Sequence, residues 1–151
     1  MHGAEVRFTH PIPTTARAAQ FAMKDDQRPL PDVQIVMGHA GMSGVMIDAA
    51  VKAGAKAIVI AGLGAGNMSR AARDSVAAAV RAGVFVVRAS RLPAAHVSRK
   101  GEIDDDALGT VVSGDLSPQK ARLVCQLALR QPQTAKSLQQ LIFKVAGEPS
   151  T

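Results

Sequence analysis

A glycine-rich turn at residues 62–67 is the first place in this chain where backbone and side chain together could bind a ligand. An apolar run over residues 57–61 leads into the letters GLGAGN, and an alanine-rich helical pattern follows. Glycines let the backbone bend sharply beneath a ligand, and Asn67 can both donate and accept hydrogen bonds. In an open α/β sheet such a turn lies at the carboxyl ends of the strands, where ligands bind. The turn therefore predicts a site.

Glu102 is the second candidate for chemistry. It follows Gly101 in a long polar loop over residues 89–106, after an apolar run over residues 84–88. Loops at strand ends carry function disproportionately. On composition alone, the simpler interpretation is that residues 102–106 form a solvated acidic turn.

Most other chemistries lack their motifs. There is no P-loop, no paired-cysteine metal motif and no His-Glu-x-x-His, so we expect neither a metal nor a cofactor. The dinucleotide fingerprint needs a glycine where Asn67 stands, although Arg88, at the end of the next strand, could suit a 2′-phosphate. Nucleotide binding is therefore a third-ranked alternative.

Two further side chains have ordinary explanations. His39 is the best placed of the histidines, just beyond the first apolar run, and a structural or solvated role is expected for it. Cys125 falls on the apolar face of a helical pattern, which predicts a core residue rather than a nucleophile.

The elements that must position these residues alternate along the chain from Val33 onward. Buried strands are predicted over residues 33–37, 57–61 and 84–88, with a shorter strand over 110–113. Ser43 is predicted to cap the first helix and Ser117 a later one. The inward-facing stripes of the four predicted helices are Met46, Ile47, Ala50 and Val51; Ala72, Val76, Ala79 and Val80; Ala121, Val124, Cys125 and Ala128; and Leu138, Leu141, Ile142 and Val145.

Strands separated by amphipathic helices indicate βαβ units and a parallel sheet. The predicted fold is α/β: a doubly wound, mostly parallel sheet of roughly four strands with helices on both faces, in three Rossmann- or flavodoxin-like layers. Residues 1–32 are punctuated by prolines and keep no apolar period, apart from a possible edge strand over 6–9. We therefore expect residues 1–32 to be a linker and the tail of a missing N-terminal domain, and residues 33–151 to form the folded domain.

Charge and composition argue against several partners. The formal net charge is +6, but the basic residues are scattered, and tryptophan and tyrosine, which could stack on bases, are absent. Neither a membrane span nor the apolar core of a signal peptide is present. We expect no nucleic acid and no membrane as partners, and if the complete protein is exported, its signal is not in this chain.

Three segments resemble one known family, the C-terminal domain of bacterial L-asparaginases, especially the exported, tetrameric type II enzymes. The letters VFVVRASRLP at 84–93 are similar to the family's VVRSSRVP, and GEIDD at 101–105 is similar to AEVDD. The letters SGDLSPQKAR at 113–122, followed by QLAL, are similar to SGxLxPQKAR and LQLAL. Order and spacing agree from Val33 to about Phe143.

The resemblance implies hydrolysis of L-asparagine to L-aspartate and ammonia, with L-glutamine as a possible second substrate. In that family the threonine nucleophile, in a Gly-Gly-Thr motif, and a Thr-Asp-Thr motif lie in an N-terminal domain, and both motifs are absent here. No catalytic residue is therefore expected in this chain, which is predicted to be an inactive fragment when alone. The family's C-terminal domain supplies an Asn and a Glu to a neighbouring subunit's substrate site, and these positions fall on Asn67 and Glu102.

The resemblance further implies a homo-oligomer, the family's tetramer built as a dimer of dimers, and a periplasmic location, with the cytoplasm as the alternative. The turn departs from the family's Gly-x-Gly-Asn-Gly-Asn at Ala65, and the residues between Pro93 and Gly101 are distinct. These departures bear on asparagine against glutamine preference. A free-standing small-molecule-binding or regulatory α/β domain is the alternative function, because a fold does not fix a function.

Overall fold

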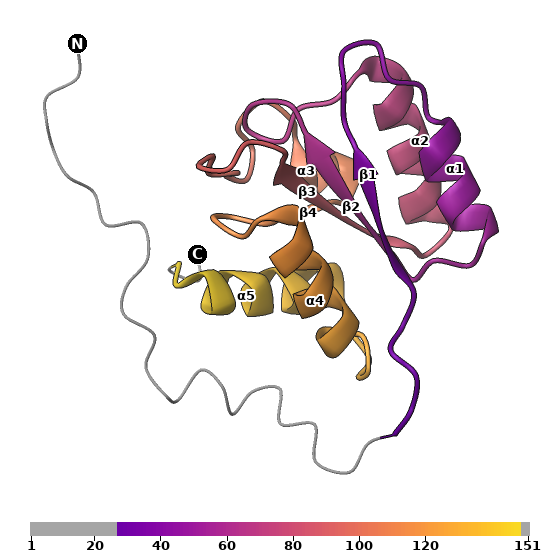
Figure 1. The fold of residues 1–151 in the computed structure, drawn as a ribbon, viewed down its shortest axis with the longest axis vertical. Helices are drawn as coiled ribbons and strands as arrows, with labels where there is room; N and C mark the ends of the chain where they lie inside the picture. Colours follow the sequence, from indigo (N-terminus) through magenta and orange to yellow (C-terminus); the bar gives the residue numbers. More distant parts are fainter. Residues whose placement is uncertain (1–26, 149–151) are drawn as a thin grey trace, which may run out of the picture.

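A computed structural model describes residues 27–148 as a sheet between two layers of helices (Figure 1). The predicted edge strand over residues 6–9, and all but the last six residues of the predicted linker, lie outside the described residues. Residues 27–32 contain no helix or strand. The elements in chain order are β1 (Val33–Met37), α1 (Val45–Lys52), β2 (Ala57–Gly62), α2 (Arg70–Arg81), β3 (Phe85–Ser90), α3 (Asp105–Leu108), β4 (Val111–Val112), α4 (Pro118–Ala128) and α5 (Ala135–Ala146).

The sheet has four parallel strands in the order β1-β2-β3-β4, so each strand pairs with the next along the chain. Val33 pairs with Ala57, and Ala57 in turn with Phe85, at the amino ends of the first three strands. The carboxyl ends of β2 and β3 are aligned as well, because Gly62 pairs with Ser90. The loops that follow these two strands are therefore neighbours at one edge of the domain.

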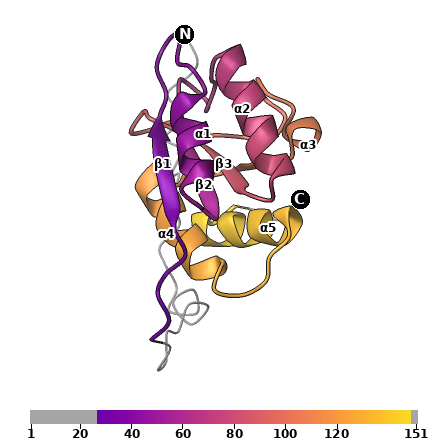
Figure 2. The same cartoon turned by 90° about the vertical axis from the view of Figure 1, so that its right-hand side faces the viewer.

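The helices cover both faces of the sheet, as Figures 1 and 2 show. Ile58 and Ile60 of β2 belong to the core that packs against α1 and α2. Ala57 and Val59, which alternate with them, belong to the core that packs against α4 and α5. Every residue of β2 is buried, as expected for a central parallel strand covered on both sides. The predicted three-layer α/β fold is confirmed.

The start of α1 differs from the prediction. Gly44, not Ser43, is the N-cap residue, and no side chain caps the helix. A Cβ at Gly44 would lie 1.8 Å from Ser75 Oγ, so the glycine allows α1 to begin close against α2. Met46, predicted to face inward, is 65% exposed, because the buried stripe of this helix consists of Ile47 and Ala50.

The loop predicted over residues 89–106 contains a helical turn that the apolar pattern did not indicate. Asp104 caps α3 by accepting hydrogen bonds from the backbone N–H groups of Asp106 and Ala107. Gly109 ends α3 in the left-handed conformation. This helix is four residues long, which is too short to have an apolar period.

Candidate functional site at the carboxyl ends of β2 and β3

The glycine-rich turn after β2 is closed by two backbone hydrogen bonds. The Leu63 N–H donates to Asn67 O at 2.8 Å, and the Asn67 N–H donates to Leu63 O at 2.7 Å. Gly66 has a φ of 81°, and a Cβ placed there would lie 2.9 Å from Val97 Cγ1. Glycine is thus required at this position both by conformation and by the lack of space. The closed turn ends at Asn67, whose backbone makes both of these hydrogen bonds.

The structure brings the two predicted site residues together. Asn67 Nδ2 donates to Glu102 Oε2 at 2.5 Å, from the loop after β2 to the loop after β3. The Asn67 Oδ1 atom accepts from the Met68 N–H at 2.8 Å, which fixes which end of the amide faces Glu102. Within residues 27–148 no other hydrogen bond to the Glu102 carboxylate is recorded, and this side chain is exposed. One carboxylate oxygen is therefore open to a ligand.

A buried ion pair lies beneath these two residues. Arg88 Nε and Nη2 donate to the two carboxylate oxygens of Asp105, at 2.6 Å and 2.8 Å, and both side chains are 0% exposed. Asp105 also accepts from Thr110 Oγ1 at 2.7 Å and from the Lys100 N–H at 3.0 Å. Burial alone raises the pKa of Asp105, but the hydrogen bonds from Arg88, Thr110 and Lys100 outweigh it and hold this pKa below its ordinary value.

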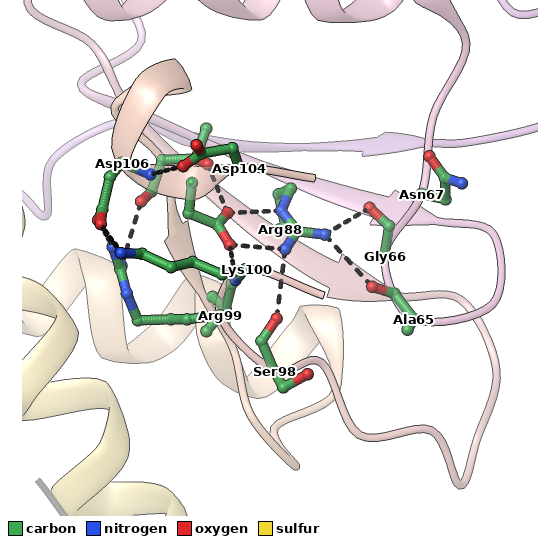
Figure 3. A network of polar contacts seen from close by, with 12 residues as sticks. Ala65, Gly66, Asn67, Arg88, Ser98, Arg99, Lys100, Asp104 and Asp106 are labelled. Carbon is green, nitrogen blue, oxygen red and sulfur yellow. Dashed lines mark hydrogen bonds and ion pairs between the residues drawn. The ribbon is translucent and has the colours of Figure 1, made fainter. Parts of the chain in front are cut away.

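Arg88 also reaches the glycine-rich turn (Figure 3). Its Nη1 atom lies 3.3 Å from Ala65 O and 3.2 Å from Gly66 O, and its Nη2 atom lies 3.4 Å from Ser98 O. The guanidinium is thus enclosed by protein groups, and the suggestion that it could bind a 2′-phosphate is wrong. The interpretation of residues 102–106 as a solvated turn is wrong for Asp105 but consistent with the exposure of Glu102.

The sequence did contain a signal for this ion pair. Arg88 stands in the run VFVVRAS, which is otherwise apolar or small, and an arginine buried in a strand requires a carboxylate partner. The acidic residues that follow in the next loop supply it.

The structure agrees with the ordinary explanations given for the other two candidates, His39 and Cys125. His39 is exposed, and its Nδ1 atom lies 3.0 Å from the carbonyl oxygen of its neighbour Ala40. Cys125 is buried, and burial raises the pKa of its thiol to about 12, so it is a core residue as predicted.

A histidine and two carboxylates lie together at another part of the surface. His96 Nδ1 is 3.0 Å from Asp115 Oδ1 and 3.6 Å from Glu148 Oε1, and Glu148 also accepts from the Asp115 N–H. One potential ligand atom from each residue lies within 4.8 Å of the others. Burial raises the pKa of Glu148, against the opposing effect of His96. The mutual hydrogen bonds account for this cluster.

Two surface hollows among the described residues lie away from Asn67 and Glu102. One lies between α3 and α5, beside Arg99 and Gln139, and the other lies at the amino ends of the strands, beside Pro31 and Phe85. Glu102 is exposed and Asn67 is half-buried, so their hydrogen-bonding groups lie on an open edge of the domain.

The fold and this edge define a class of protein: a three-layer α/β domain with hydrogen-bonding side chains on the loops that follow parallel strands, where ligands bind in such folds. A family model described as the glutaminase/asparaginase C-terminal domain matches residues 32–142. The chain belongs to this family, as the resemblance predicted.

Curated relatives agree with the family match. The chain is 43% identical over 112 residues to L-asparaginase 2 of Escherichia coli and 41% identical over 111 residues to a probable periplasmic L-asparaginase of Haemophilus influenzae. Each match covers 74% of this chain and 32% of the relative. A glutaminase-asparaginase of Pseudomonas fluorescens is 37% identical over 145 residues, which cover 95% of this chain and 40% of the relative. The chain thus spans about a third of the length of the curated relatives it matches.

One further observation concerns membranes. Among the helices of the described residues, none combines the length and the apolar character that crossing a bilayer requires.

Proposed function

We propose that this chain is the C-terminal domain of an L-asparaginase, in which Asn67 and Glu102 complete the substrate site of a neighbouring subunit. The hydrogen bond of 2.5 Å between Asn67 Nδ2 and Glu102 Oε2 is the observation that carries the proposal, together with membership of the family. The reaction is hydrolysis of L-asparagine to L-aspartate and ammonia, without a cofactor.

The chemistry of the two side chains suits substrate binding. The open oxygen of Glu102 pairs with the α-ammonium of the amino acid, in a charge-assisted hydrogen bond of the stronger kind. Asn67 braces the carboxylate from its other oxygen. Neither residue is an efficient nucleophile for an amide without a base and an oxyanion hole, so both act in binding.

The relatives favour asparagine as the main substrate and leave glutamine as a second one. All three relatives described above carry the word asparaginase in their names, and one of them is also named a glutaminase. We propose asparagine first, with the difference at Ala65 in the glycine-rich turn as the place where preference is tuned.

The open edge supports a homo-oligomer as the working form. The Glu102 side chain is exposed in the domain alone, so another surface is needed to enclose a substrate over it. We propose the tetramer, a dimer of dimers, as that form. A periplasmic location is proposed as well, because one relative is named periplasmic.

These 151 residues alone are expected not to hydrolyse asparagine, because the threonine motifs of the family are absent from them. Ammonia release by the purified chain is to be compared with release by a complete asparaginase. Turnover at a few per cent of that enzyme would contradict the proposal.

Glu102→Gln in the complete enzyme is expected to lower kcat/KM by about ten- to a hundredfold, because a hydrogen bond to a charged group is lost. The free energy of unfolding should change by less than about 0.5 kcal/mol, since the side chain is exposed. Asn67→Ala should lower kcat/KM by less, because it removes a neutral brace. Steady-state kinetics and urea unfolding measure both effects.

Subunit mixing tests whether the site is shared. Hybrids of Glu102→Gln subunits with subunits that lack the nucleophile should regain activity, because some sites then combine an intact Glu102 with an intact nucleophile. Unchanged kinetics in Glu102→Gln would favour the alternative interpretation, in which Glu102 belongs to a solvated acidic turn and does not bind substrate. Absence of rescue would contradict a shared site and favour the free-standing binding domain, whose signature is ligand binding by the chain alone.

A further inference from the structure

We infer that the buried Arg88–Asp105 ion pair sets the distance between Asn67 and Glu102, so that Arg88 and Asp105 are positioning residues for this site. The functional meaning of the inference rests on the proposed function. The claim that this ion pair holds the two loops at a fixed distance rests only on contacts within the described residues.

Each end of the ion pair holds one of the two loops. On the side of the glycine-rich turn, Arg88 Nη1 donates to the carbonyl oxygens of Ala65 and Gly66, the two residues immediately before Asn67. On the side of the following loop, Asp105 Oδ2 accepts from the Lys100 N–H, two residues before Glu102. A continuous series of charge-assisted hydrogen bonds, through the buried Arg88 and Asp105 side chains, thus connects the turn with the loop (Figure 3).

An arginine is suited to this task in a way that a lysine is not. The planar guanidinium donates in three directions at once, to the Asp105 carboxylate, to the turn and to Ser98 O. An ammonium group is a compact charge on a flexible stem and cannot span the same acceptors. Because both partners are 0% exposed, water does not compete for these hydrogen bonds.

The backbone conformation beside Glu102 is unusual, as expected for a segment that is held in place. Lys100 has a φ of 55°, and it is the one non-glycine residue with a positive φ among residues 27–148. Its N–H group is held by Asp105 Oδ2, and the unusual conformation directs the chain into Gly101 and Glu102. Strained residues of this kind persist where the surrounding structure determines them, and they cluster at functional sites.

The test follows the Asn67 side-chain amide by nuclear magnetic resonance on the isotope-labelled chain. Its Nδ2 resonances are expected to shift when Glu102 is changed to glutamine, because the hydrogen bond to a charged carboxylate is lost, and this Asn67 shift is then measured again in each of the following variants. Arg88→Lys is expected to reduce the shift to less than about half, because the turn and the loop are no longer held together. Arg99→Lys is the matched control and should leave the shift intact, since Arg99 pairs with Asp106 at the surface.

A purely structural role for Arg88 makes a different prediction. Arg88→Lys would then lower the urea midpoint but leave the coupling between Asn67 and Glu102 unchanged. A folded Arg88→Lys chain with the full Asn67 shift overturns the inference.

A second pair of variants decides the question if Arg88→Lys does not fold. Lys100 is exposed, so its substitution leaves the core untouched. Lys100→Ala keeps the left-handed constraint and should keep the shift, whereas Lys100→Gly frees the backbone and should weaken it. Equal shifts in the two Lys100 variants would overturn the inference.

Kinetics of the complete enzyme separate this inference from the proposed function. Arg88→Lys is expected to raise KM for asparagine by about tenfold while kcat changes little, as for weakened substrate binding. Loss of the Asn67 shift with normal kinetics in both Arg88→Lys and Glu102→Gln would leave the positioning role standing and overturn the proposed function. Impaired Glu102→Gln kinetics with an intact Asn67 shift in Arg88→Lys would overturn the positioning role and leave the proposed function standing.

Discussion

At the scale of single residues, the charge of Arg88 is buried in β3 and needs a partner. An unpaired arginine in such a place would be strongly destabilising, and removing one member of a buried pair usually costs several kcal/mol. Arg88 avoids this penalty because Asp105 accepts two of its hydrogen bonds. The stability of the domain is therefore tied to the ionisation of one carboxyl group.

This dependence predicts sensitivity to acid. The folded-state pKa of Asp105 lies below the ordinary value of 3.8, so its stabilising contribution is complete above that value and is lost as the pH falls through the folded pKa. Thr110→Val removes one donor and should raise this pKa, lower the free energy of unfolding by about 1 kcal/mol at neutral pH, and shift acid unfolding to higher pH. Urea unfolding followed by circular dichroism at a series of pH values, from acid to neutral, measures the free energy of unfolding and its dependence on pH. An unchanged acid midpoint would mean that Thr110 does not support the Asp105 carboxylate.

The candidate site was partly predictable from the sequence at this scale. Asn67 and Glu102 were each predicted from their place in a loop after a strand, while the expectation that both serve one site came from the family resemblance. The burial of Asp105 did not follow, because composition does not distinguish one aspartate of GEIDDD from the next. That distinction depends on which carboxylate the three-dimensional path of the loop brings to Arg88.

At the scale of elements, the glycine-rich turn connects β2 with α2 and passes over Arg88. Its glycines are not equivalent. A Cβ at Gly66 would have three protein atoms within 3.3 Å, whereas a Cβ at Gly64 would have nothing within 4 Å. Gly64 has a φ of 50° and Gly66 a φ of 81°, so both share the conformational requirement, and of these two only Gly66 has the steric one.

Gly66→Ala is therefore expected to lower the free energy of unfolding by about 2–4 kcal/mol, since backbone strain and overpacking add. Gly64→Ala, its matched control, should cost about 1 kcal/mol from the left-handed backbone alone. Chemical unfolding of the two variants beside the parent chain gives both values. Equal losses would show that contact with Val97 and Arg88 does not limit the turn.

Elements were predictable where a period or a strong cap marked them. The three long strands and four long helices followed from apolar stripes, and Ser117 caps α4 as predicted. The start of α1 could not be predicted, because the fit of Gly44 against Ser75 is a tertiary contact. The helix α3 escaped prediction because its stabilising groups, Asp104 and Gly109, lie outside any apolar pattern.

At the scale of the whole molecule, β1 and α1 carry large apolar side chains that are exposed to solvent. Val45 and Met46 of α1 are each 65% exposed, and Met37 at the end of β1 is 60% exposed. β1 is also the first strand of the sheet, with β2 as its one recorded partner among the described residues. Exposed apolar groups of this kind favour association.

We expect the chain to self-associate at high concentration. Changing Val45 and Met46 together to lysine should shift sedimentation velocity profiles toward the monomer, because apolar area is replaced by repelling charge. Leu123→Lys on α4, where the side chain is 53% exposed on the other layer, is the control and should have little effect. A clean monomer for the parent chain at high concentration would contradict the prediction.

The order of the elements along the chain has a consequence for the way this domain is made. All four strands precede α4, which begins at Pro118, yet α4 and α5 alone cover one face of the sheet. A chain still emerging from the ribosome therefore completes β1, β2 and β3, with α1 and α2 on one side, while Val33, Val59 and Val87 remain bare on the other. Until α4 and α5 have been synthesised, the nascent chain displays an apolar sheet face of the kind that aggregates and that chaperones bind.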